Sequence, residues 1–189
     1  MITRPRINLL LLSVVCCSLL LICACGEKRQ IRQTLRKFNT TTIVFPERMK
    51  VIQNGKDSMS PVPEGLKYVI YIPPEECSTC SIGHMPEYAP VFSLGDTLGF
   101  STVIILSPSP ESRRDVDHLL HLKRFDFPVW LDADFAFRDT NPAIPESRRF
   151  HCFLISSKGN PIFTGDLRRP YMQSLLKGFF RDSSINRDL

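Results

Sequence analysis

From residue 68 onward, apolar runs and amphipathic stretches alternate along the chain. Two runs are continuously apolar, YVIYI at 68–72 and TVIIL at 102–106. Strands whose two faces are both buried in a sheet have this character. A further strand is predicted at 150–156 (FHCFLIS), and the polar turn at 157–160 separates it from a partner strand at 161–164. This last pattern predicts a hairpin.

Between and after these strands, apolar residues recur at the spacing of a helix. Three helices are predicted, at 80–94 with interruptions at Pro86 and Pro90, at 111–124, and at 170–180. A short strand or extended segment is predicted at 128–131. The resulting order is β-α-β-α-β-β-β-α. Alternating strands and helices imply right-handed parallel crossovers, so we expect an α/β fold with a mixed central sheet and helices on both faces.

The segment before residue 67 is less regular. Its expected elements are an amphipathic helix over 27–38, a strand over 41–45 (TTIVF), an edge-like strand over 49–53, and a polar loop over 54–65. A disordered tether is the alternative for the first of these.

The N-terminus has the pattern of a secretory signal. Arg4 and Arg6 precede an apolar run from Leu9 to Ala24 that only two serines interrupt. This run is short for a bilayer span, which needs about 20 apolar residues. We therefore expect residues 1–24 to be a signal peptide, with an uncleaved anchor helix as the alternative.

The end of this run, Ile22-Cys23-Ala24-Cys25, resembles the bacterial lipobox. The resemblance implies that Cys25 is diacylated and becomes the mature N-terminus, because two acyl chains give stable membrane attachment. Cys17 is the weaker candidate. We expect a membrane-anchored lipoprotein of the cell envelope that faces the periplasm. The expected organisation is a signal peptide at 1–24, an anchor, tether and N-terminal extension at 25–66, a main domain at 67–182 and a tail at 183–189.

The number of cysteines and the net charge exclude some classes of function. Of the seven cysteines, three leave with the signal and Cys25 carries lipid, so Cys77, Cys80 and Cys152 remain as thiols. One close pair and one odd cysteine do not make a disulfide scaffold. The net charge of +5 falls to +3 when the two signal arginines are removed. We therefore expect no nucleic-acid partner, since no basic stripe with interleaved aromatic residues is present.

The close pair lies at the junction between a buried strand and the next helix. Cys77 follows the strand at 68–72 by a few residues, and Cys80 opens the helix. A thiolate at a helix N-terminus is stabilised by free N–H groups and by the helix dipole. Two intervening residues let the second cysteine resolve a mixed disulfide. The position therefore favours a redox-active dithiol, and we expect no cofactor.

These features resemble the thioredoxin-like (TlpA-like) membrane-anchored bacterial lipoproteins over Tyr68 to about Phe180. The resemblance rests on the strand YVIYI, the cysteine pair, Pro86 near the helix-kinking proline, and the hairpin FLISSKGNPIFTGD at 153–166. It implies a thioredoxin-like fold and a thiol–disulfide oxidoreductase that acts on protein thiols and disulfides in the periplasm. Cys77 would be the nucleophile and Cys80 the resolving residue of a Cys77–Cys80 disulfide.

Three positions depart from that family. Glu75 and Glu76 precede the first cysteine, and two acids there oppose thiolate formation. Phe150, followed by His151, occupies the place of the family's cis-proline and is expected to shape the surface that meets a partner. Cys152 is an additional thiol, most often a small buried hydrophobe on such a strand.

Two other functions remain open from the residues alone. In the first, Cys77–Cys80 is a static disulfide in a redox-inert binding module. In the second, the chain is a copper or zinc chaperone, because thiolate and imidazole ligands suit both metals. The candidate ligands would be Cys77, Cys80, His84 and His151. They lack tetrahedral ligand spacing, so no metal site is the expectation.

Overall fold

The computed structural model describes residues 28–181. The chain divides into two units, Met1–Phe38 and Asn39–Leu189. Residues 28–39 are helical, close to the amphipathic helix expected at 27–38. No helix among the described residues is both long enough and apolar enough to cross a bilayer. The predicted signal peptide, the predicted lipidation site Cys25 and the predicted C-terminal tail lie outside the described residues.

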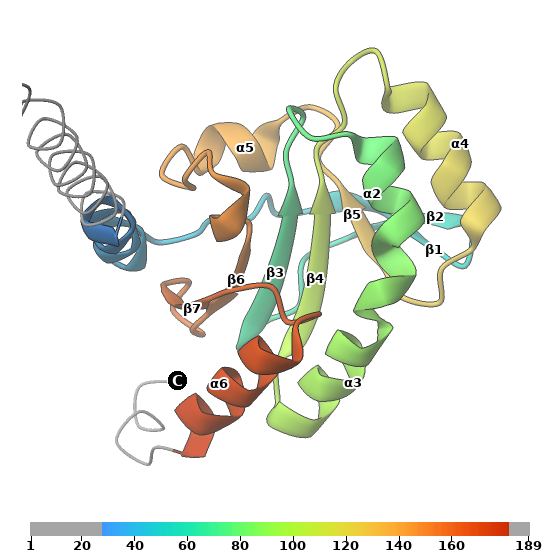
Figure 1. Ribbon diagram of the computed structural model, residues 1–189. Coiled ribbons are helices and arrows are strands. Elements are labelled where there is room, and N and C mark those ends of the chain that lie inside the picture. Colours follow the sequence, from blue (N-terminus) through green and yellow to red (C-terminus); the bar gives the residue numbers. More distant parts are fainter. Residues whose placement is uncertain (1–27, 182–189) are drawn as a thin grey trace, which may run out of the picture. The chain divides into compact units, whose positions relative to one another are not determined.

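The second unit is built on one seven-stranded mixed sheet with the order β2-β1-β5-β4-β3-β6-β7 (Figure 1). The strands are β1 Met49–Gln53, β2 Lys56–Ser60, β3 Lys67–Ile72, β4 Ser101–Leu106, β5 Val129–Leu131, β6 Cys152–Ile155 and β7 Pro161–Thr164. All six residues of β3 are buried, which explains the apolar run from Tyr68 to Ile72 that follows Lys67. β3 pairs with β4 in parallel and with β6 antiparallel, and β6 pairs antiparallel with β7.

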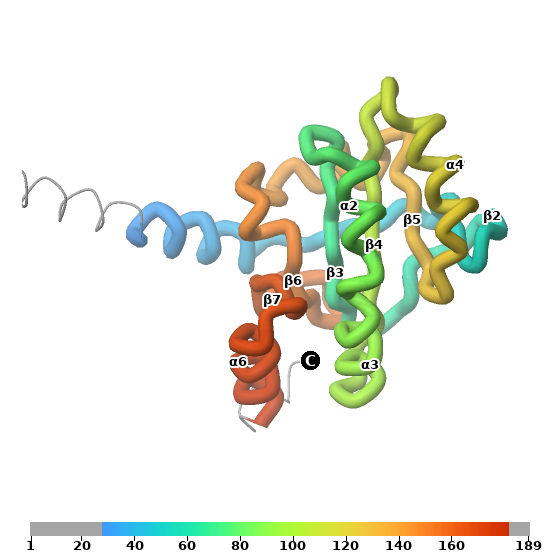
Figure 2. The backbone as a smooth tube through the Cα atoms, turned by 45° about the vertical axis from the view of Figure 1, so that its right-hand side comes forward, coloured from blue at the N-terminus to red at the C-terminus, as the bar shows by residue number. Residues whose placement is uncertain are grey.

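Helices cover both faces of this sheet. Their bounds are α2 Ser78–His84, η1 Met85–Tyr88, α3 Ala89–Leu98, α4 Arg113–Lys123, α5 Ala136–Thr140, η2 Arg148–Phe150 and α6 Pro170–Arg181. In Figures 1 and 2, α2 and α3 follow each other along the same side of β3 and β4. Tyr68, Ile70 and Ile72 of β3 enter one core cluster with residues of α2, η1, α3, α4 and α6. That cluster occupies the first face.

The short helix α5 packs on the second face. Phe137 of α5 is fully buried, stacks on Phe45 with 5.4 Å between ring centroids, and meets the ring of Tyr71 edge-on at 5.3 Å. Tyr71 points away from the first core because side chains alternate along a strand. The return from β5 to β6 therefore crosses the second face, whereas the parallel crossovers use the first.

The predicted fold class is confirmed. The order β4-β3-β6-β7, with an antiparallel hairpin beside two parallel strands, is the thioredoxin-like arrangement. Residues 49–60, which the sequence analysis assigned to an N-terminal extension, form the hairpin of β1 and β2 and continue the same sheet through β5.

Two predictions for the N-terminal segment are wrong. Residues 41–45 form no strand; Ile43 N–H donates to the Gly159 carbonyl, and Val44 N–H donates to the Asn141 side chain. The loop expected at 54–65 contains strand β2, which returns from β1 through Asn54-Gly55. Both turn residues have positive φ, 51° and 68°, the conformation that two-residue hairpin turns require.

Candidate active site

The cysteine pair lies beyond the carboxyl end of β3. A loop follows Ile72, and Cys77 is the N-cap residue of α2, so Cys80 is the third residue of that helix. The two sulfur atoms form a disulfide, with 5.3 Å between the Cα atoms. Both residues are exposed, so a partner's sulfur has access to either of them.

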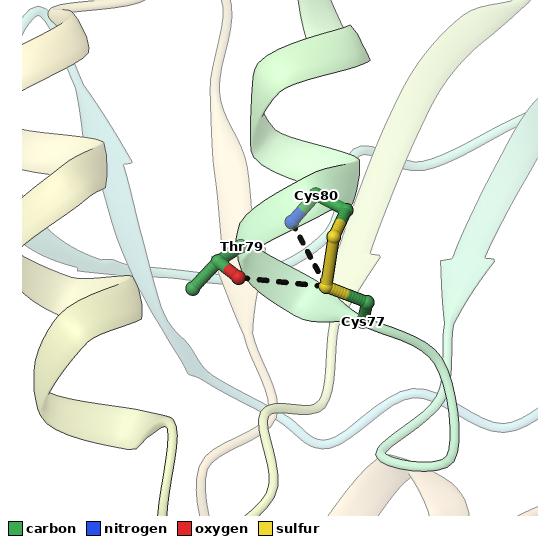
Figure 3. The surroundings of a disulfide bond; sticks show 3 residues. All are labelled: Cys77, Thr79 and Cys80. Atoms are coloured by element: carbon green, nitrogen blue, oxygen red, sulfur yellow. Dashed lines mark hydrogen bonds between the residues drawn. A yellow bond between two sulfur atoms is a disulfide. The ribbon is translucent and has the colours of Figure 1, made fainter.

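Two donors face the sulfur of Cys77 (Figure 3). The backbone N–H of Cys80 donates to Sγ over 3.3 Å, and the hydroxyl of Thr79 lies 3.5 Å from the same atom. A disulfide sulfur carries no hydrogen, so the Thr79 hydroxyl is the donor in this contact. After reduction, the same two donors stabilise a thiolate on Cys77, because hydrogen bonds to the charged form favour it.

The two acids before Cys77 are both paired with cationic groups. Glu75 contacts Arg138 of α5 at 2.6 Å, with both side chains largely exposed. Glu76 turns inward, where its carboxylate contacts His151 Nδ1 at 2.8 Å and Arg148 Nε at 3.1 Å. The opposition to thiolate formation that the sequence predicts is therefore offset by neighbouring positive charge.

Phe150 and His151 lie below the surface, each 5% exposed. Phe150 closes the short helix η2, and His151 precedes β6. Phe150 therefore offers little surface of its own, and its role in contacting a partner stays a prediction. His151 instead contacts the segment that leads to Cys77, through Glu76.

The four residues weighed as metal ligands are not brought together. His84 is exposed and its Nδ1 contacts Glu87 at 2.7 Å. Both ring nitrogens of His151 are occupied by Glu76 and by the Pro145 carbonyl. Within residues 28–181, no group of three or more His, Cys, Asp or Glu side chains is placed to hold a metal ion.

Cys152 is a poor candidate for a third redox thiol. Burial, followed by the nearby negative charge of Asp166, raises the pKa of its thiol to about 12. It packs against the first-face core, on β6. A thiol held in the neutral form is a weak nucleophile, which agrees with a packing role.

The sequence analysis above did not assign Thr79, Arg138 or Arg148 to this site. Thr79 was visible, because it lies between the two cysteines and carries a hydroxyl. The arginines gave no such signal, since they are far from the acids along the chain and reach them only through α5 and η2.

Comparison with known proteins shows only distant structural likeness. No family model matches the chain, and no curated protein matches it. The thioredoxin domain of a Bacteroides vulgatus thiol-disulfide oxidoreductase has a TM-score of 0.47 at 13% identity, covering 75% of this chain and 99% of that one. A putative thiol:disulfide interchange protein DsbE from Chlorobium tepidum has a TM-score of 0.46 at 14% identity, covering 73% and 94%. The Xanthomonas campestris bacterioferritin comigratory protein, described with alkyl peroxide reduction activity, has a TM-score of 0.46 at 14% identity, covering 71% and 92%. At these scores the fold class rests on the strand order and directions of this chain.

Proposed function

We propose that this protein is a thiol–disulfide oxidoreductase of thioredoxin type that acts on protein thiols and disulfides. The observation that carries the proposal is the exposed Cys77–Cys80 pair at the start of α2, with two hydrogen-bond donors on the Cys77 sulfur. This arrangement provides an accessible nucleophile and a resolving thiol within reach of it.

The reaction proceeds in two exchange steps. In the reduced protein, the Cys77 thiolate attacks a partner disulfide, forms a mixed disulfide and releases one partner thiolate. The Cys80 thiolate then attacks the Cys77 sulfur and releases the second partner thiolate. Two electrons pass to the partner, which takes up two protons as its thiols form, and Cys77–Cys80 becomes oxidised. The reverse sequence oxidises a partner dithiol.

The first test is the reduction potential of Cys77–Cys80. The full chain in detergent is equilibrated in glutathione buffers, and its thiols are trapped and counted in the peptide that holds both cysteines. We expect a reversible potential between roughly −120 and −270 mV, the range of catalytic dithiols. A potential below about −300 mV would indicate a structural bond and would favour a redox-inert binding module.

We further propose that the protein is a lipoprotein anchored through Cys25 and faces the periplasm. The support is the charged and apolar sequence before Ile22-Cys23-Ala24-Cys25 and the presence of a dithiol suited to an oxidising compartment. The anchor would hold the redox domain at the membrane surface, where exported proteins with thiols or disulfides would be its partners.

Replacing Cys25 tests the anchor. In a bacterial host, Cys25→Ala should abolish incorporation of labelled palmitate, because no thiol remains at the lipobox position. Cys17→Ala is the matched control and should leave labelling unchanged. Full labelling of the Cys25→Ala protein would contradict the assignment.

A further inference from the structure

Glu76 is directly N-terminal to Cys77, yet its carboxylate faces the protein interior. Its side chain is 17% exposed, compared with 63% for the neighbouring Glu75. Inside, it meets the ring of His151, whose side chain is only 6% exposed. A nearly buried imidazole and a carboxylate therefore lie in contact beside the nucleophile.

The hydrogen bonds of His151 define where its protons are. Nε2 lies 3.0 Å from the carbonyl oxygen of Pro145, which only accepts, so Nε2 must carry a hydrogen. Nδ1 lies 2.8 Å from Oε1 of Glu76, and a bare nitrogen facing a carboxylate would be repelled. A hydrogen between Nδ1 and the Glu76 carboxylate is needed to make this contact a hydrogen bond.

His151 is itself fixed to the sheet. Its carbonyl accepts a hydrogen bond of 2.8 Å from the N–H of Tyr71 in β3, and its ring meets the Tyr71 ring edge-on at 5.7 Å. Its N–H donates to the Arg148 carbonyl over 3.1 Å. Glu76 is thus tied to a rigid element, although it belongs to the loop between β3 and α2.

We propose that His151 is a positioning residue of the dithiol, which acts through Glu76. It holds the carboxylate inward and compensates its charge, so that Cys77 is presented at the start of α2 without an uncompensated acid beside it. This inference rests on the proposed redox function of the pair. Without His151, the carboxylate keeps only Arg148, whose side chain is 76% exposed, as its cationic partner. A carboxylate held by that exposed side chain alone can turn toward Cys77, which disfavours the thiolate.

The test is the rate at which iodoacetamide alkylates reduced Cys77. The full chain carries Cys80→Ser and is held in detergent at pH 7, with the product read in the peptide that contains Cys77. We expect His151→Asn to slow alkylation by about threefold to tenfold, since a tenfold loss of thiolate corresponds to about one unit of thiol pKa. His118→Asn, the same change at an exposed position on α4, is the control and should have no effect.

Adding Glu76→Gln separates charge compensation from simple support of the fold. We expect the Glu76→Gln/His151→Asn protein to react within about twofold of Glu76→Gln alone, because no carboxylate remains to be compensated. A purely structural His151 predicts that the double variant is as slow as His151→Asn or slower. That result, or an unchanged rate in His151→Asn, would overturn the proposal.

A measurement on the unaltered His151 keeps the proposal testable if His151→Asn does not fold. Nitrogen NMR of the imidazole should show hydrogen bonding at both ring nitrogens, with Nδ1 sharing a proton, and Glu76→Gln should remove that proton. A bare Nδ1 in the parent protein would refute the pairing. These readouts need no protein substrate, so they can fail or succeed independently of the reduction potential that tests the proposed function.

Discussion

Replacing Cys77 with serine should abolish disulfide exchange. The reduced protein is mixed with excess disulfide-bonded peptide, and the release of peptide thiol is followed. We expect the rate for Cys77→Ser to fall by about a thousandfold or more, because removal of a nucleophile leaves only background chemistry. The neutral serine hydroxyl is far less nucleophilic than the thiolate at the same position.

Two further cysteine variants make this result specific. Cys80→Ser should still attack but should accumulate the mixed disulfide between Cys77 and the peptide, visible as a mass increase, since the resolving thiol is missing. Cys152→Ser should exchange at the parent rate, because that thiol packs against the core and its pKa is raised. If Cys77→Ser exchanged as fast as the parent, the oxidoreductase assignment would be lost.

The largest effect on stability is expected at Phe137. Phe137→Ala should lower the free energy of unfolding by about 3–5 kcal/mol, the range for truncating a buried aromatic side chain. Its ring is fully buried and contacts both Phe45 and Tyr71, so the cavity would open between α5 and β3. Urea unfolding of the parent protein and of Phe137→Ala measures this difference. The comparison requires that the unfolding free energy depends on urea concentration with the same slope in both proteins.

Phe137→Leu is the graded control for that experiment. It keeps most of the apolar volume, so its cost should be well below that of alanine. A loss of less than about 1 kcal/mol for Phe137→Ala would mean that this face of the sheet contributes little to stability. α5 also carries Arg138, the partner of Glu75, so weakened packing of α5 is expected to loosen that ion pair.

The central strands could be predicted from the sequence because both of their faces are buried. β3 and β4 are enclosed on both faces, and their unbroken apolar runs leave no competing reading. β2 was missed for the opposite reason. Its sequence, KDSMS, is mostly exposed at the sheet edge and carries no apolar alternation. Asn54-Gly55 was the available signal, since this dipeptide favours a two-residue hairpin turn.

The segment 41–45 shows where local preference fails. TTIVF has the β-branched composition of a strand, but its backbone donors find a turn carbonyl at Gly159 and the side chain of Asn141. Such partners depend on the tertiary fold. The same holds for the pairing of Glu76 with His151, which joins residues far apart in the chain. The sequence analysis considered both residues, but separately. It expected Glu76 to oppose thiolate formation and His151 to lie in a segment that faces a partner.

The position of β3 in the sheet has a consequence for how the chain folds during synthesis. Its two neighbours are β4 and β6, and Tyr68 pairs with Leu154, which the ribosome adds much later. Until β6 emerges, one edge of this apolar strand has no partner, and unpaired strand edges promote aggregation. Contacts this distant in sequence also slow folding. We therefore expect nascent chains that end before residue 152 to remain unfolded and to depend on a chaperone.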